Sequence, residues 1–248
     1  MMDRNEMEEL LFKALKLDTH PVAVRLSENG TDLAEQPLSL KLNNCQLISI
    51  ARHQGKYSSG APERMVCAIG AACTGLVKTP SGFIDGTAAV GKYTADSEAG
   101  REFFRNTFKL GDSGARYRAI EFAPLGSAPF NADVVIVYGN PAQIMRLVHA
   151  NSWRDGCATR GDTVAEAAVC SSMAIAMNTG EAIIGLPCAG DRRFGGTQNH
   201  EMLFAAPFEV FREKIVPSLA EMLEAAGSLY PVAPWVMYQG EMSDEYTL

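Results

Sequence analysis

The sequence predicts an α/β (or α+β) fold, a single domain with a mixed sheet and helices packed around it. Strand-like apolar runs alternate along the chain with segments of helical periodicity, which is the order typical of this class. The run Asp133–Tyr138 is β-branched and nearly continuous, as expected of a strand that is buried on both faces. No repeat and no sharp change of composition divides the 248 residues. We therefore expect one domain over residues 1–248, with a peripheral tail from about residue 231.

The first elements are a helix, a strand and a second helix. Leucines at helical spacing give Glu6–Leu17 one apolar face, opposite a charged one. Pro21–Leu26 is an apolar run with proline at its entry, which is typical of a strand. Either Asn43 or Asn44 is a good N-cap for a helix that runs to His53.

The middle of the chain contains the clearest strand. Arg64–Ile69 resembles a buried strand, and the phenylalanines of Ser97–Leu110 line one side of a helix. The short apolar strand Ala119–Pro124 precedes Asp133–Tyr138. That longer strand leads into an Asn-Pro pair, a preferred N-cap followed by a preferred first helical residue. A helix is therefore expected to begin at Pro141.

The last third again alternates helix and strand. Thr163–Asn178 is a helix rich in small residues, and the apolar run Ala182–Leu186 is a strand. A further strand, Met202–Ala206, leads into a helix over Phe208–Ala226. That helix must bend or restart at Pro217, because proline cannot donate to the helical hydrogen-bond ladder.

Charge and hydropathy argue against several classes of function. The net charge of −7 disfavours a general nucleic-acid binder and provides no basic face for an anionic membrane. The acidic N-terminus, Met1–Leu17, lacks the basic segment and the cleavage site of a signal peptide. The longest strongly apolar run, Met65–Val77, is too short to span a bilayer. These features predict a cytoplasmic protein.

Motifs that would name a reaction are missing. The chain has no glycine-rich dinucleotide fingerprint, no phosphate-binding P-loop, no His-Glu-x-x-His zinc motif and no nucleophile elbow. Its four histidines are scattered. The sequence leaves the substrate and the oligomeric state open.

The six cysteines carry the most distinctive chemistry in the chain. Without a secretion signal they are expected to be reduced thiols. Their spacings match neither a zinc finger nor a ferredoxin. A single cysteine is most often a small buried hydrophobic residue, but folding can also bring distant cysteines into one cluster.

The chain around Cys170 and Cys188 is the strongest candidate for a site. Cys170 lies on an expected helix, and Cys188 follows the end of an expected strand. A polar loop, Ala189–Gly196, comes next and carries Asp191 and Arg192. Because α/β proteins place chemistry at the ends of strands, we expect these side chains to share a pocket.

Several stretches have the pattern of a known family. They are Pro21-Val22-Ala23-Val24, Ala123-Pro124-Leu125, Asp133-Val134-Val135-Ile136, Asn140-Pro141-Ala142-Gln143, Met145-Arg146, Cys188-Ala189-Gly190-Asp191-Arg192 and Glu201-Met202. Over nearly its whole length the chain resembles the domain-of-unknown-function 169 family of archaea and bacteria. The Asn-Pro-x-Gln and Cys-x-Gly-x-Arg pieces are the most specific. The resemblance implies a characteristic set of four cysteines but no reaction. These are Cys45, Cys67, Cys170 and Cys188, whereas Cys73 and Cys157 are less characteristic.

The favoured hypothesis is a cysteine-lined pocket that binds a metal, an iron–sulfur centre or a small redox ligand. Soft thiolates suit zinc and iron–sulfur clusters, so both cofactors are considered. The expected ligands are Cys45, Cys67, Cys170 and Cys188.

Two other functions stay open. The first is a cysteine-dependent enzyme for a small anionic substrate, with Cys188 as nucleophile and Asp191 or His200 as its acid–base partner. In that hypothesis Arg192 is directed into the pocket and lowers the pKa of the thiol. The second is a non-catalytic module that binds a small anion. Its donors would be Asn140, Arg146 and Arg192.

Overall fold

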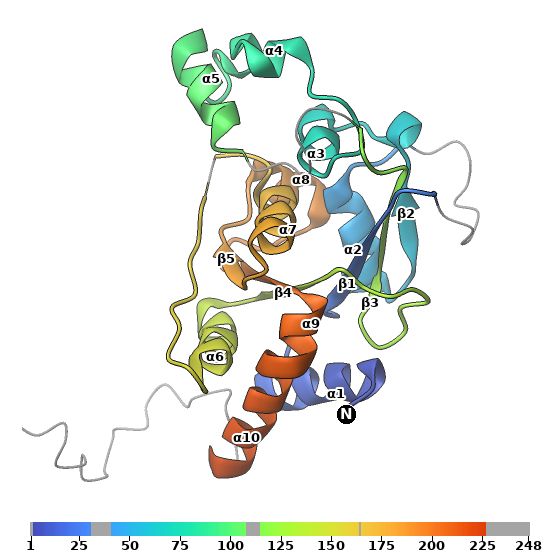
Figure 1. Cartoon of the computed structure of the whole chain (residues 1–248), viewed down its shortest axis with the longest axis vertical. Coiled ribbons are helices and arrows are strands. Elements are labelled where there is room, and N and C mark those ends of the chain that lie inside the picture. Colours follow the sequence, from blue (N-terminus) through green and yellow to red (C-terminus); the bar gives the residue numbers. More distant parts are fainter. Residues whose placement is uncertain (1, 31–40, 108–114, 164, 227–248) are drawn as a thin grey trace, which may run out of the picture.

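The computed structural model describes residues 2–30, 41–107, 115–163 and 165–226. Within these ranges a sheet of six strands is covered by helices on both faces (Figure 1). This arrangement confirms the predicted α/β class. The peripheral tail expected from residue 231 lies outside the described residues.

The six strands are ordered β2–β3–β1–β4–β6–β5 across the sheet. They are β1 (Val22–Ser27), β2 (Ser58–Gly60), β3 (Ala119–Pro124), β4 (Val134–Gly139), β5 (Ile183–Gly185) and β6 (Met202–Pro207). Each pair of neighbours is antiparallel. In the described ranges parallel pairing is limited to isolated bridges, such as Arg160 with Ile183. The expectation of a mixed sheet is corrected accordingly. β4 and β5 do run in the same direction, but β6 lies between them and pairs antiparallel with both.

Strand β4 lies in the interior of the sheet, as its β-branched run predicted. It pairs with β1 on one side and with β6 on the other. Val134 and Ile136 point into the core on one face, and Val135 and Val137 point into the core on the opposite face. All four side chains are buried, which explains why this strand has no polar alternation.

Helices of two groups cover opposite faces of the sheet. The longer ones are α1 (Arg4–Leu15), α2 (Asn44–Gln54), α5 (Ser97–Arg105), α6 (Pro141–Ser152), α7 (Ala168–Thr179) and α10 (Val216–Ala226). The shorter ones are η1 (Pro62–Arg64), α3 (Ala68–Cys73), α4 (Ser81–Ile84), η2 (Thr87–Ala89), α8 (Ala189–Gly195), α9 (Phe208–Val210) and η3 (Phe211–Ile215). Residues of α2, α3 and α7 share one core with the sheet, and residues of α1, α6, η3 and α10 share the other. Helices α4, η2 and α5 pack against one another.

Local capping signals set several helix boundaries. Asn43 caps α2 through a hydrogen bond from the backbone N–H of Gln46, and Gly55 ends that helix in the left-handed conformation at φ 66°. Asn140 caps α6, which begins at Pro141 as predicted. At the N-terminus Asp3 caps α1, so this helix begins two residues before the predicted start at Glu6.

Three predicted elements differ from the structure. Arg64–Ile69, predicted to be a buried strand, contains the end of η1 and the start of α3, and Val66 is 55% exposed. Within the predicted helix Thr163–Asn178, regular helix begins at Ala168, after Ala167 in the left-handed conformation. The expected polar loop Ala189–Gly196 is instead helix α8 with a left-handed Gly196 at its end. The stretch Ala189–Gly196 contains three glycines, and glycine disfavours helix in isolation, so the sequence favoured a loop here.

The helix predicted to bend or restart at Pro217 instead continues through this residue. The chain passes from α9 through the π-helical turn η3 into α10, and Pro217 is the second residue of α10, one position beyond the last residue adjoining this turn. A π turn widens the hydrogen-bond ladder by one residue, which gives room to a proline that cannot donate.

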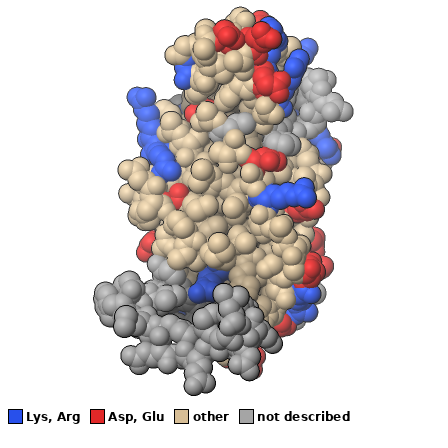
Figure 2. All heavy atoms as spheres, turned by 90° about the vertical axis from the view of Figure 1, so that its left-hand side faces the viewer, with Lys and Arg blue, Asp and Glu red and all other residues tan. Residues whose placement is uncertain are grey.

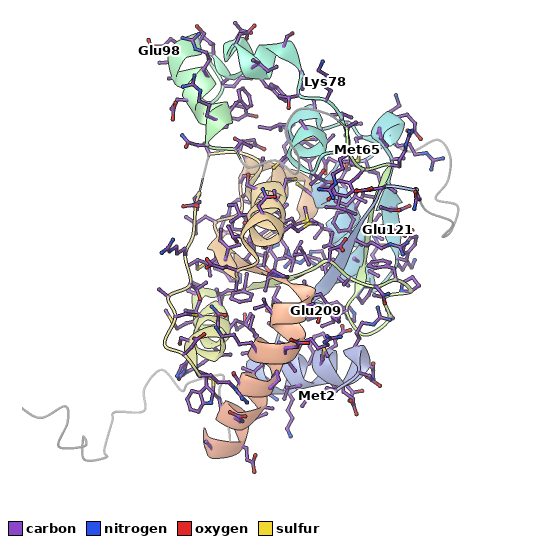
Figure 3. All side chains as sticks on the ribbon, viewed as in Figure 1. Met2, Met65, Lys78, Glu98, Glu121 and Glu209 are labelled. Atoms are coloured by element: carbon purple, nitrogen blue, oxygen red, sulfur yellow. The ribbon has the colours of Figure 1, made fainter. Side chains whose placement is uncertain are left out.

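Acidic and basic side chains are mixed on the surface, and a few are buried. On the face drawn in Figure 2, acidic and basic side chains are interspersed between uncharged areas. In the interior, Glu121 of β3, labelled in Figure 3, is fully buried and accepts from Arg25 and from the hydroxyl of Tyr57 at 2.9 Å.

In the part of the chain that the structure describes, no helix has the length and apolar character needed to cross a membrane.

Candidate functional site

A cavity of about 440 Å³ lies on the face of the sheet that α2, α3 and α7 cover. Four of the six cysteines line it, although they are distant in the sequence. They are Cys45, Cys67, Cys170 and Cys188. The other lining side chains include polar ones from several elements, namely Lys41, Asn43, Asn44, Gln46, Tyr93 and Glu166. The fold thus brings together the four cysteines that the sequence singled out.

Each of the four cysteines lies at the N-terminal end of a helix. Cys45 is the second residue of α2, and Cys170 is the third residue of α7. Cys67 and Cys188 occupy the N-cap positions of α3 and α8. The first turn of a helix has backbone N–H groups without helical partners, so these sulfurs lie where hydrogen-bond donors are available.

Hydrogen bonds to two of the sulfurs follow from this placement. The backbone N–H of Gly70 donates to the Sγ of Cys67 at 3.3 Å. The side-chain amide Nδ2 of Asn44 donates to the Sγ of Cys170, also at 3.3 Å. Asn44 is buried, and its Oδ1 has no hydrogen-bond partner among the described residues. An unsatisfied buried oxygen is costly, and a donor from a bound group would satisfy it.

Two glycines allow the sulfurs to approach one another. A Cβ placed on Gly70 would lie 3.3 Å from the Sγ of Cys67 and 3.3 Å from the Sγ of Cys170. A Cβ on Gly190 would lie 3.5 Å from the Sγ of Cys188 and 3.9 Å from that of Cys45. Each glycine thus lies next to two of the cavity sulfurs, and any side chain at Gly70 would contact both Cys67 and Cys170.

Two carboxyl groups accompany the thiols. Asp191 is buried and accepts from the backbone N–H of Cys188 at 3.2 Å and from the hydroxyl of Tyr138 at 3.3 Å. Glu166, which is half-buried, places Oε1 3.5 Å from the Sγ of Cys188. Burial raises the pKa of both carboxyl groups.

Burial also raises the pKa of all four thiols. It is the largest cause for Cys45, Cys67 and Cys170, and it raises the pKa of Cys188 to about 12. For Cys188 the carboxylate of Asp191 adds to this effect, because a nearby negative charge disfavours the thiolate. Without a bound cation, these four cysteines are therefore protonated thiols at neutral pH.

A buried arginine, Arg52, contacts the cavity residues indirectly, through Tyr138. Arg52 of α2 is 1% exposed, pairs with Glu201 and places its guanidinium 4.0 Å from the centre of the Tyr138 ring. Its Nη1 and Nε also donate to two threonine hydroxyls. Through Tyr138 this network reaches Asp191, so the position of that carboxyl group depends on residues from four separate parts of the chain.

The other residues predicted for the site lie elsewhere. The guanidinium of Arg192 donates to the carbonyl oxygen of Gln198 at 2.5 Å and does not line the cavity, so the expected lowering of the Cys188 pKa is not observed. His200 is exposed on the turn before β6. Asn140 caps α6, and Arg146 lies on that helix, which packs against the opposite face of the sheet. None of these four residues is among the described side chains that line the cavity.

Sequence reasoning missed several residues that line the cavity. Tyr93 comes from the glycine-punctuated segment between α4 and α5, which has no clear periodicity. Asn44 was considered as a helix cap, but Asn43 holds that position and leaves the amide of Asn44 free to contact Cys170. Phe194, 47% exposed, lies on α8, which was expected to be a loop. The neighbouring Asn43-Asn44-Cys45 sequence was the one local signal available.

The sulfurs do not converge on a single point. Among the residues that the structure describes, no three histidine, cysteine, aspartate or glutamate side chains are grouped so that they could hold one metal ion. A zinc ion bound by four cysteines would require all four sulfurs at about 2.3 Å from it. The wider spacing of the thiols around a cavity weighs against the mononuclear zinc site considered from the sequence.

Comparisons with known proteins identify relatives but no activity. The family model DUF169, described as "Uncharacterised ArCR", matches residues 10–216. An uncharacterised protein of Methanocaldococcus jannaschii, MJ0308, is 26% identical over 224 residues, which cover 86% of this chain and 93% of the relative. No solved structure matches the chain.

Proposed function

Since this chain belongs to the DUF169 family, whose description names no reaction, we propose its function from the cavity: it binds a polynuclear metal–sulfur centre of the iron–sulfur type. The protein ligands in this proposal are Cys45, Cys67, Cys170 and Cys188. Clusters of this type are commonly held by four cysteine thiolates.

The observation that carries the proposal is the convergence of four thiols from four helix ends on one cavity. In a [4Fe–4S] cluster held by four cysteines each iron takes one protein thiolate, so the four sulfurs surround the cluster and need not meet at one point. Four thiols that line a cavity meet this requirement better than they meet the requirement of a single ion.

The electrostatics of the cavity favour a cationic guest. Four thiols with raised pKa values and two carboxyl groups face the cavity or border it. Metal ions displace the thiol protons on binding, and the resulting thiolates are stabilised by the metal charge. The donors from Gly70 and Asn44 then act on ligand sulfurs, and such hydrogen bonds tune the reduction potential of a centre.

The two alternative functions have weaker support. A nucleophilic Cys188 requires a stabilised thiolate, whereas its pKa is raised to about 12. The donors expected for an anion-binding module, Arg146 and Arg192, lie outside the cavity. Lys41 does line it, but the carboxyl group of Glu166 lines it too, which disfavours an anion. Both alternatives would also leave the convergence of four cysteines unexplained.

Metal and sulfide analysis tests the proposal. The full chain is purified anaerobically and, if colourless, reconstituted with ferrous iron and sulfide; bound iron and acid-labile sulfide are then measured alongside the visible spectrum. We expect several irons per chain with matching sulfide, and loss of the spectrum when Cys45 or Cys170 is replaced by serine. Cys73→Ser is the matched control, because Cys73 is buried but does not line the cavity. Zinc without sulfide, or the same iron content in all variants, would contradict the proposal.

A further inference from the structure

A second cysteine environment lies on the opposite side of the sheet. Cys157 follows α6, and its Sγ lies 3.2 Å from the Nζ of Lys214 in η3. The Nζ also lies 2.8 Å from the Oδ2 of Asp155, whose other oxygen, Oδ1, accepts from the backbone N–H of Cys157 at 3.1 Å. Asn151 completes the group, since its Nδ2 lies 3.4 Å from the sulfur.

This group is separate from the cysteine-lined cavity. α6 and η3 belong to the core on the face that α1 covers, and neither Cys157 nor Lys214 lines the cavity. Cys157 is half-buried, and the side chain of Lys214 is 25% exposed, so small solutes can reach the sulfur. A sulfur beside an ammonium and an amide donor has the surroundings typical of a reactive cysteine.

We propose that Cys157 and Lys214 form a covalent sulfur–nitrogen link when hydrogen peroxide or a related hydroperoxide oxidises the protein. The geometry carries the inference: the two reacting atoms come from positions 57 residues apart and are held 3.2 Å from each other. Such pre-alignment makes an intramolecular step much faster than its intermolecular counterpart.

The reaction balances in two steps. In the first, the Cys157 sulfur attacks one peroxide oxygen, the O–O bond breaks, and the second oxygen leaves as water after taking up a proton. The sulfur is thereby oxidised to a sulfenic acid and the peroxide is reduced. In the second step the Lys214 ammonium gives a proton to the sulfenic hydroxyl, which departs as water, and the nitrogen lone pair forms the S–N bond. The nitrogen then releases one more proton, for which the Asp155 carboxylate is the nearest acceptor.

The sequence makes the product easy to identify. Trypsin cuts after Arg154 and Arg160, so Cys157 lies in a short peptide over 155–160. It also cuts after Arg212, and a linked Lys214 blocks the next cleavage, so its peptide covers 213–248, which contains no cysteine. A link between these two peptides therefore cannot be a disulfide.

The experiment treats the full chain with hydrogen peroxide, blocks free thiols, digests with trypsin and analyses the peptides by mass spectrometry. We expect the two peptides joined, with the loss of two hydrogen atoms, and separated again by dithiothreitol. In Lys214→Arg the cation stays beside Asp155 but is a poor nucleophile, so a cyclic 1,3-diketone should trap more Cys157 sulfenic acid than in the unmodified chain. Cys73→Ser should form the link normally.

Three results would overturn the inference. One is wild-type protein whose Cys157 stays unmodified at peroxide concentrations that oxidise its other thiols. Another is direct conversion of Cys157 to sulfinic acid while Lys214 remains cleavable by trypsin. A linked pair that retains an oxygen atom would refute the condensation step. Each result is read on wild-type protein, so it does not depend on how the variants fold or on whether the cavity holds metal.

Discussion

The amide nitrogen of Asn44 donates to the sulfur of Cys170 at 3.3 Å, although 126 positions separate the two residues in the chain. The contact joins the first turn of α2 to the first turn of α7. It leaves the Oδ1 of Asn44 buried beside the cavity and without a partner among the described residues. Asn44 is therefore placed to support a ligand cysteine through its amide nitrogen.

Asn44→Ala should lower the free energy of unfolding of the metal-free protein by about 1 kcal/mol, the usual contribution of one hydrogen bond. In reconstituted protein it should also shift the reduction potential, because a donor to a ligand sulfur is lost. Urea unfolding and potentiometric titration measure the two effects. An unchanged potential in the presence of a full centre would show that the Asn44 amide does not act on it.

Gly70→Ala should leave the metal-free fold intact but prevent most metal loading. Its Cβ would lie 3.3 Å from two cavity sulfurs, whereas alanine is a better helix former than glycine by about 0.5–1 kcal/mol. The matched control is Gly82→Ala in α4, where the nearest contacts of a Cβ start at 3.4 Å and the cavity is not involved. Iron content and melting temperature are measured for both variants. Equal iron loading in the two would argue against a guest between Cys67 and Cys170.

In the metal-free protein the rate of Cys188 alkylation should be low at neutral pH. It should increase about tenfold per pH unit up to about pH 12. The sign follows from the raised pKa: the reactive thiolate is the minor form until pH approaches the pKa of about 12. Iodoacetamide labelling followed by peptide mapping gives the rate. A plateau near the ordinary thiol pKa of about 8.5 would contradict the burial argument.

Asp191→Asn should speed the same alkylation at a given pH. The Asp191 carboxylate is the second cause of the raised Cys188 pKa, after burial, so removing its charge favours the thiolate. The substitution keeps the size of the side chain. An unchanged or slower labelling rate, with the far-ultraviolet circular dichroism preserved, would mean that burial alone controls this thiol.

Replacing Arg52 with methionine should lower the stability of the protein much more than replacing Arg192 with methionine. Arg52→Met leaves Glu201 buried without its partner and should destabilise the protein by about 3–5 kcal/mol. Arg192→Met removes a partly exposed donor to a carbonyl and should change stability by about 0.5 kcal/mol at most, with metal loading unaffected. Denaturant unfolding and metal analysis test both. Loss of metal in a stably folded Arg192→Met would restore the site role expected from the sequence.

Local sequence signals predicted the elements whose boundaries depend on neighbouring residues. Asn43 and Gly55 mark the ends of α2, and the Asn140-Pro141 pair marks the start of α6, because capping is decided within one helical turn. The β-branched run of β4 likewise predicted an interior strand, because burial on both faces requires apolar side chains at every position. Where local signals conflicted, as in the glycine-rich α8, the prediction was wrong.

The sequence by itself determined most of the strands and helices and the cap residues, since each depends on composition or on contacts a few residues apart. The set of four cysteines followed from the family resemblance. Only the tertiary structure decided that β6 lies between β4 and β5, that Cys45, Cys67, Cys170 and Cys188 face one cavity, and that Arg52 rather than Arg192 supports it. These outcomes depend on contacts between segments that are distant in the sequence. The free energy that favours such contacts comes from apolar burial across the whole core, and the local pattern of residues does not show which distant segments will pack together.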